Sequence, residues 1–181
     1  MGITLDGRIA DEDGNSRWIT GADAREKVQD LRRSADAIMV GAGTIRADNP
    51  SLLPRPDHGR EPWRVVVGAN VSEEAQVFTD QAAHRTLVQD GKLEDVLKEL
   101  AGRGIMHVLC EGGGELAGSL IRAVLVDEFI IFMAPSLLGG SGVPMVGKQG
   151  WELSEMPRLS FQSVKQCGDD LCIRAVPLKE N

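Results

Sequence analysis

Apolar runs and amphipathic stretches alternate along most of this chain. Short apolar runs bounded by glycine or polar residues are typical of buried strands, and they occur at residues 37–43, 63–68, 105–110 and 127–135. Shorter strands are predicted at AQVF (75–78) and RTLVQ (85–89), and a strand is expected to end near residues 3–5. The segments 158–167 and 171–178 flank a Gly-Asp-Asp turn, which predicts an antiparallel hairpin.

Helices are predicted between several of these strands. One begins near TGAD (Thr20–Asp23), which has the spacing of a capping box, and its apolar stripe is Ala24, Val28, Leu31 and Ala35. A second spans Lys92–Gly102, and a third follows the glycines after Cys110 and runs to about Val124. Residues 6–18, 44–62 and 136–150 are rich in glycine, proline and polar residues and are expected to be loops.

This order of elements predicts an α/β fold. Alternating strands and helices favour a mostly parallel sheet, to which the C-terminal hairpin adds antiparallel strands. No repeat, linker or low-complexity tract interrupts residues 1–181, so a single domain is expected.

Composition excludes several classes of protein. The formal net charge is −7 and no run of lysine or arginine is present, which argues against nucleic-acid binding. No apolar stretch approaches the roughly 18 residues of a membrane span, and the N-terminus lacks the blocks of a signal peptide. The three cysteines and three histidines show no CxxC or other metal-ligand spacing, so neither a metal site nor a disulfide framework is expected. A cytoplasmic protein with reduced thiols fits best.

The stretch CEGGGELAG (110–118) is predicted to be a strand end, a glycine turn and a helix start. The carboxyl end of a parallel strand is where ligands bind in open α/β sheets, and a helix N-terminus with bare glycine backbone suits a pyrophosphate. Glycine is also common in such turns for purely structural reasons. The carboxylate of Glu111 could bind a ligand hydroxyl or amide, or accept a neighbouring backbone N–H, and residue type does not decide between them.

Two further places hold candidate binding residues. Arg32 borders the apolar stripe of the first helix, where its head could reach a ligand or simply be solvated. Thr44, Asp48 and Asn49 follow a strand, and loops of that kind often bind ligands, although Asp and Asn before proline also initiate turns.

Five segments together resemble one known family. GITLDGRIA, SRWIT, LRRSADAIMVGAGTIRADNPSL, CEGGGELAGSLI and LVDEFIIFMAPSLLGG occur in the order and spacing of the RibD C-terminal domain family, the bacterial pyrimidine reductases of riboflavin biosynthesis. The resemblance implies a dihydrofolate-reductase-like three-layer fold, a homodimer, and NADPH as the cofactor. It implies hydride transfer to the ribose C1′ of 5-amino-6-(5-phosphoribosylamino)uracil, giving the ribityl compound.

The resemblance also implies roles for individual residues. The residues expected at the cofactor are Gly2, Trp18, Thr44, Asp48, Gly113, Gly114, Glu115, Leu116, Ala117, Gly118 and Ser119. The residues expected at the phosphorylated pyrimidine are Ser16, Arg32, Leu52, Arg55 and Glu111. Glu111, Asp48 or a water would supply the proton.

The chain departs from the family pattern in places. It begins inside the family's first strand, Gly68-Ala69 replaces the usual Asp-Ser, and Ser136 stands where a lysine is usual. No HxE or PCxxC sequence of the zinc deaminase that often precedes this reductase is present. Two other functions are compatible with the sequence: a dihydrofolate or pterin reductase of the same fold, and a nucleotide-binding protein without catalytic activity.

Overall fold

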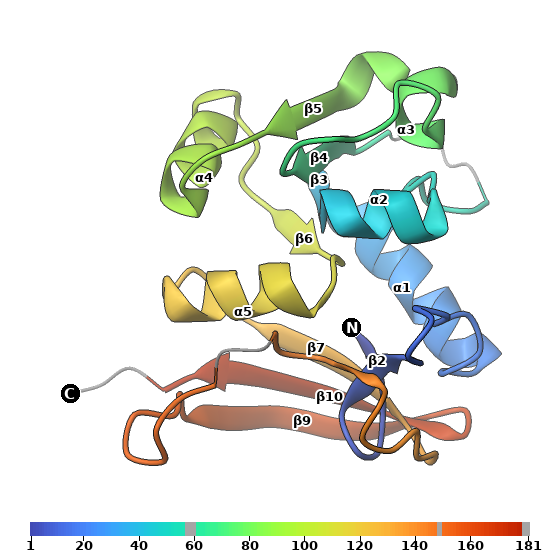
Figure 1. Cartoon of the computed structure of the whole chain (residues 1–181), viewed down its shortest axis with the longest axis vertical. Helices are drawn as coiled ribbons and strands as arrows, with labels where there is room; N and C mark the ends of the chain where they lie inside the picture. The colour runs from blue at the N-terminus through green and yellow to red at the C-terminus, as the bar shows by residue number, and fades with distance from the viewer. Residues whose placement is uncertain (57–60, 148–149, 179–181) are drawn as a thin grey trace. The chain divides into compact units, whose positions relative to one another are not determined.

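The chain forms two compact units in a computed structural model that describes residues 1–56, 61–147 and 150–178 (Figure 1). One unit is continuous and comprises Lys27–Leu116. The other combines the two ends of the chain, Met1–Glu26 and Ala117–Asn181. Helices α1 (Ala22–Ser34) and α5 (Gly114–Arg122) each contain residues of both units.

The continuous unit is built on a parallel sheet of order β5-β4-β3-β6. Its strands are β3 (Ala37–Gly41), β4 (Trp63–Val67), β5 (Thr86–Gln89) and β6 (Val108–Cys110). The connecting elements are α2 (Ala42–Asp48), α3 (Gln76–Thr79), the 3-10 turn η1 (Ala83–Arg85) and α4 (Leu93–Gly102). Apolar residues of β3 and β4, among them Ile38, Val40 and Val66, are fully buried against Ile45, Leu52 and Val77. Their burial gives this unit its own core.

The second unit contains the mixed sheet β1-β7-β10-β9. Strand β1 (Gly2–Thr4) is parallel to β7 (Phe129–Ala134), whereas β10 (Asp170–Pro177) is antiparallel to both β7 and β9 (Leu159–Cys167). The last two strands are the hairpin expected from the sequence. The α/β class, with a parallel sheet and a C-terminal antiparallel hairpin, is therefore confirmed.

Two helices occupy segments for which the sequence predicted something else. The predicted strand AQVF is wrong: its last three residues form most of helix α3, with Val77 fully buried in the core. The predicted loop after Gly43 is also wrong at its start, because α2 follows β3 directly and buries Ala42 and Ile45 one turn apart. Asn49 ends α2 in a left-handed conformation, and its Oδ1 accepts the N–H of Gln76 at 2.7 Å, which joins the two helices.

Two short strands were likewise missed in predicted loops. β2 (Arg8–Ala10) pairs antiparallel with β8 (Val143–Pro144) in a separate two-stranded sheet. Each is too short to show alternation of apolar and polar residues, so the tertiary pairing decides its conformation. Lys148 and Gln149, in the predicted loop 136–150, lie outside the described residues, as does the 57–60 part of the predicted loop 44–62.

A buried charge fixes the middle of the parallel sheet. The side chain of Arg64 in β4 is fully buried, and its Nη1 donates to Asp80 Oδ2 at 2.6 Å and to Ser51 O at 3.2 Å. Its Nη2 donates to Val77 O at 2.8 Å. A buried guanidinium requires such partners, so Arg64 is a structural residue that links β4 to α3 and to the loop after α2.

Candidate functional site

The candidate site lies at the carboxyl edge of the parallel sheet. Met39 of β3 pairs with Cys110 of β6, and Gly41 pairs with Val67 of β4. The N–H of Glu111 still donates to Met39 O at 2.9 Å, so Glu111 leaves β6 beside the end of β3. The sequence-based expectation that this stretch is a strand end followed by a helix is confirmed by β6 and α5.

Two residues expected at the substrate form a bidentate ion pair. Arg32 Nε donates to Glu111 Oε1 at 2.8 Å, and Arg32 Nη2 donates to Glu111 Oε2 at 2.6 Å. The two side chains are only 11% and 19% exposed, so the pair is largely removed from water. Arg32 is therefore not a solvated surface residue, and Glu111 pairs with a cation. Such a fork fixes the plane of the carboxylate.

The third nitrogen of Arg32 ties the pair to the loop after α2. Nη1 donates to Leu53 O at 3.2 Å. Leu52, one of the expected substrate residues, is buried and has a φ of 62°, so its side chain packs inside the unit and its backbone is in a region that L residues rarely adopt. Arg55 is exposed, and with Leu53 it lines a cavity of about 220 Å³ beside this loop. Arg55 thus lies two residues along the loop from the Leu53 carbonyl that Arg32 contacts.

The three glycines after Glu111 have different roles. A Cβ on Gly112 would lie 2.6 Å from Gly41 N and 2.8 Å from Val40 Cα, so only glycine fits where the turn crosses the end of β3. Gly113 is half-buried, and the nearest atom to a Cβ placed on it would be Thr44 Oγ1, at 3.8 Å. Gly114 is buried and begins α5. The turn therefore needs Gly112 for packing and leaves open space at Gly113.

Thr44 and Asp48, expected at the cofactor, both lie on α2. Thr44 Oγ1 accepts the N–H of Gly113 at 3.3 Å, which places the hydroxyl at the glycine turn. Asp48 is exposed at the other end of the helix, yet incomplete solvation of its carboxyl raises its pKa. That direction is the one a proton donor requires. Asn49, by contrast, has the structural role of joining α2 to α3.

The remaining candidates on α5 differ in what surrounds them. Glu115 and Ser119 are exposed, Ala117 is half-buried, and Leu116 is buried. Gly118 is buried, and a Cβ there would lie 2.9 Å from Arg122 Nη2 and 3.3 Å from Gly147 N. Its small size thus serves packing within the protein. Backbone N–H groups without an intrahelical partner occur only in the first turn of a helix, so Gly114, at the start of α5, is better placed than Gly118 for an anion.

Three expected residues lie near the N-terminus, in the second unit. Gly2 is in β1, where a Cβ would lie 3.1 Å from Thr20 Cγ2. Ser16 is half-buried, and Trp18 is 81% exposed, with the guanidinium carbon of Arg25 5.9 Å from its ring centre. An exposed indole is available to a ligand, but the roles of these three residues remain predictions.

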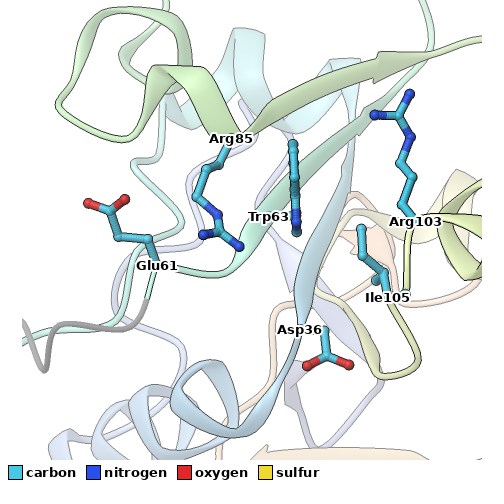
Figure 2. Close-up of a pocket in the computed structure, with 7 residues that line it drawn as sticks. Asp36, Glu61, Trp63, Arg85, Arg103 and Ile105 are labelled. Atoms are coloured by element: carbon cyan, nitrogen blue, oxygen red, sulfur yellow. The ribbon is translucent and has the colours of Figure 1, made fainter.

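A larger cavity, of about 280 Å³, lies at the opposite edge of the parallel sheet (Figure 2). Asp36 precedes β3, Trp63 begins β4 and Arg85 precedes β5, so its lining comes from the amino ends of the strands. The Arg85 guanidinium lies 5.1 Å from the Trp63 ring centre. Asp36 accepts the N–H groups of Met106 and His107, a structural role. Ligands of open α/β sheets bind at the carboxyl edge, so we place the candidate site at Glu111.

Other chemistry is limited in the described chain. Burial raises the pKa of the Cys110 thiol, which disfavours a thiolate nucleophile. Within residues 1–56, 61–147 and 150–178, no three His, Cys, Asp or Glu side chains are grouped to hold a metal ion. None of the helices in those ranges combines the length and apolar character needed to cross a bilayer.

The chain matches known proteins over almost its whole length. The family model of the RibD C-terminal domain matches residues 1–173. The riboflavin biosynthesis protein RibD of Bacillus amyloliquefaciens is 37% identical over 96% of this chain, and that of Mycobacterium tuberculosis strain CDC 1551 / Oshkosh is 38% identical over 96%. The chain covers 55% and 52% of those two proteins, so it spans about half the length of these relatives.

Solved structures agree with this result. Form 2 of Acinetobacter baumannii RibD superimposes with a TM-score of 0.89 at 27% identity, over 98% of this chain and 56% of the other. A Thermotoga maritima protein described as a diaminohydroxyphosphoribosylaminopyrimidine deaminase and 5-amino-6-(5-phosphoribosylamino)uracil reductase gives 0.87 at 28% identity, over 98% and 55%. Both superpositions include both units of this chain but only a little over half of each RibD protein.

Proposed function

Because the chain belongs to the RibD C-terminal domain family, we propose that it is an NADPH-dependent reductase of 5-amino-6-(5-phosphoribosylamino)uracil. The observation that supports this function best is the Arg32–Glu111 pair at the carboxyl edge, next to the open Gly113 turn. The oriented Glu111 carboxylate suits a polar substrate. The glycine backbone beside it suits the phosphate groups of a cofactor.

Glu111 binds the pyrimidine substrate in this proposal. Each of its oxygens accepts one hydrogen bond from Arg32 and retains a further lone pair. Because Arg32 fixes the carboxylate plane, those lone pairs point in set directions and can accept from substrate hydroxyl or amide groups. Orientation of this kind lowers the entropy lost on reaching the reactive geometry.

Arg32 and Arg55 supply the positive charge for the ribose phosphate. A guanidinium has five N–H groups, and three from Arg32 donate to Glu111 and Leu53. The other two have no partner in the described part of the chain and can donate to a phosphate. Arg55 is exposed two residues after Leu53 on the same loop, and its guanidinium can add a second positive charge for the same anion.

The residues at the glycine turn fit a nicotinamide dinucleotide. Space for a close approach exists at Gly113, and the first N–H groups of α5 follow at once. Thr44 adds a hydroxyl at the same point. When bound, NADPH supplies the hydride, and the chain's contribution is to bind and orient. Asp48, whose pKa is raised, is the proposed proton donor on α2.

The experiment is a direct assay. The purified protein is mixed with NADPH and 5-amino-6-(5-phosphoribosylamino)uracil, and loss of absorbance at the nicotinamide band is followed together with the ribityl product. Turnover of dihydrofolate in place of the pyrimidine would assign the protein to pterin reduction. Binding of NADPH without turnover of either substrate would leave a nucleotide-binding protein. The homodimer implied by the resemblance is checked by light scattering on the same sample.

A further inference from the structure

Three side chains on one face of α1 hold the loop that carries Arg55. Gln29, Arg32 and Arg33 are three and four positions apart, so they lie on the same side of the helix. Arg32 Nη1 donates to Leu53 O at 3.2 Å. Gln29 Oε1 accepts the N–H of Arg55 at 2.8 Å, and Arg33 Nη1 donates to Arg55 O at 3.2 Å. The helix therefore contacts the backbone of this loop at three points, and two of them are on Arg55.

The two contacts to Arg55 involve both polar groups of its backbone. Arg55 is exposed and lies in no helix or strand, so regular secondary structure does not fix its conformation. Exposed loop residues of this kind are ordinarily among the more mobile parts of a protein. Here Gln29 binds the N–H and Arg33 binds the carbonyl of one residue. We call these two side chains the Arg55 clamp, and the guanidinium of Arg55 takes part in neither contact.

The clamp is itself restrained on the helix. Arg33 Nη2 pairs with Asp30 Oδ1 at 2.5 Å, and Lys27 pairs with the other oxygen of Asp30 at 3.3 Å. The hydrogen bond from Arg33, and after it the one from Lys27, lowers the pKa of Asp30, so this carboxylate stays ionised beside Arg33. Gln29 is half-buried. Side chains that are already restrained lose less entropy when they hold a loop.

The same contacts indicate that the clamp acts through Arg55 and not on a ligand. Both ends of the Arg33 guanidinium are engaged, Nη1 with Arg55 O and Nη2 with Asp30, so its charge is shared with a carboxylate. The Gln29 atom that contacts the loop is an acceptor oxygen, which does not attract an anion. What the two residues determine together is the backbone position from which the Arg55 side chain extends.

We propose that Gln29 and Arg33 are positioning residues for the substrate: they fix the Arg55 backbone, so that its guanidinium binds the ribose phosphate without first having to be ordered. This inference rests on the proposed function. A group that is ordered before binding loses less entropy in the complex. The phosphate is at the far end of the ribose from C1′, where hydride is transferred, so its contact with Arg55 is the same in the bound substrate and in the transition state. Loss of the clamp should therefore raise KM and leave kcat unchanged.

Steady-state kinetics with the pyrimidine and NADPH test the clamp. Gln29→Met keeps the length of the side chain without the acceptor oxygen, and Arg33→Met removes the donor. We expect each variant to raise the KM for the pyrimidine about three- to tenfold, the effect of one lost hydrogen bond. The kcat, and the KM for NADPH, should not change. A purely structural role would not confine the effect to the KM of one substrate, and thermal melts confirm that the variants are folded.

The Arg55→Ala background shows whether the clamp acts through Arg55. In that background Gln29→Met and Arg33→Met should raise KM no further, because the guanidinium that they position is gone. Lys27→Met is the matched control for Arg33→Met. It removes the same charge from the same helix and also breaks an ion pair with Asp30, but the Lys27 side chain is 62% exposed and its ion pair lies on the surface. We expect a wild-type KM for this control.

Several results would overturn the clamp while the proposed function stands. They are a wild-type KM in either Gln29→Met or Arg33→Met, a KM increase of undiminished size in the Arg55→Ala background, and an equal increase in Lys27→Met. A fall in kcat without a change in KM would overturn it as well. If the folded wild-type protein does not reduce the pyrimidine at all, the proposed function is wrong and the clamp falls with it.

Discussion

Arg32 and Glu111 lie 79 residues apart in sequence and are joined by two parallel hydrogen bonds of 2.8 and 2.6 Å. The pair connects α1 to the carboxyl end of β6 at the edge where substrate is proposed to bind. A bidentate contact that is mostly buried restrains both side chains. The two residues should therefore act as one unit, and substitutions at either should affect the other.

Arg32→Ala should lower kcat/KM for the pyrimidine roughly 10–150-fold, because a charge-assisted contact of about 1.5–3 kcal/mol is lost and the Glu111 carboxylate is no longer oriented. NADPH affinity should barely change. Steady-state kinetics and titration of NADPH measure the two effects. Lys27→Ala on the same helix is the control, because the Lys27 side chain is 62% exposed and its ion pair with Asp30 lies on the surface. Wild-type kinetics in a folded Arg32→Ala protein would show that the pair is purely structural.

Glu111→Gln should also lower kcat/KM strongly. Because the substitution breaks the ion pair with Arg32, it should lower the stability of the protein as well. The amide keeps one acceptor oxygen but turns an N–H group toward Arg32, so we expect the free energy of unfolding to fall by about 1–3 kcal/mol. Chemical denaturation measures that loss. In a double-mutant cycle, Arg32→Ala with Glu111→Gln should cost much less than the sum of the single changes. Additive losses would contradict coupling through the pair.

The glycine turn allows packing and ligand binding to be tested at adjacent positions. Gly112→Ala would place a Cβ 2.6 Å from Gly41 N, a clash with backbone that cannot be relieved by a rotamer change, so we expect a large fall in Tm. Gly113→Val should fold, because the nearest atom to its Cβ is 3.8 Å away, yet bind NADPH at least about tenfold more weakly, or about 1.4 kcal/mol. Differential scanning calorimetry and titration separate the two outcomes. Wild-type NADPH affinity in Gly113→Val would mean that the turn has no part in cofactor binding.

The sequence predicted the strongly periodic elements and missed those defined by tertiary contacts. The stripe of α1, the apolar run of β3 and the alternating residue types of the hairpin were recognisable because each sequence pattern extends along the whole element. Helices α2 and α3 span seven and four residues, too few for the helical repeat of apolar residues to be recognised in the sequence. Each is stabilised by one buried side chain, Ile45 in α2 and Val77 in α3, which packs in the core of the unit.

The candidate site shows the same limit. The order of strands and helices indicated the carboxyl edge, and glycines next to a carboxylate indicated the position on it. No local pattern shows that Arg32 pairs with Glu111, that Gly112 rather than Gly113 is sterically required, or that Arg46 contacts the turn after β4. Those facts depend on contacts between segments distant in sequence.

Asp6 makes the second unit sensitive to acid. Its carboxylate accepts hydrogen bonds from Thr4 Oγ1 at 2.5 Å and from the N–H groups of Leu138 and Gly139 at 3.2 and 2.7 Å. The hydroxyl of Thr4 first, and these backbone N–H groups after it, lower the pKa of Asp6 from 3.8 to about 2. A lowered pKa in the folded state means that this stabilisation is complete above pH 3.8 and is lost as the pH falls toward 2.

Asp6→Asn should remove that part of the acid sensitivity. The amide cannot be ionised, so the Tm of the variant should be lower than that of the wild type at pH 7, and the difference should shrink steadily between about pH 4 and pH 2. Asp13→Asn is a control of the same charge change in an exposed turn, where the Asp13 N–H donates to Asp11. Thermal melts of the three proteins across this range provide the measurement. If the Tm difference between Asp6→Asn and the wild type stays constant from pH 7 to pH 2, ionisation of the Asp6 carboxyl does not strengthen its hydrogen bonds to residues 138 and 139.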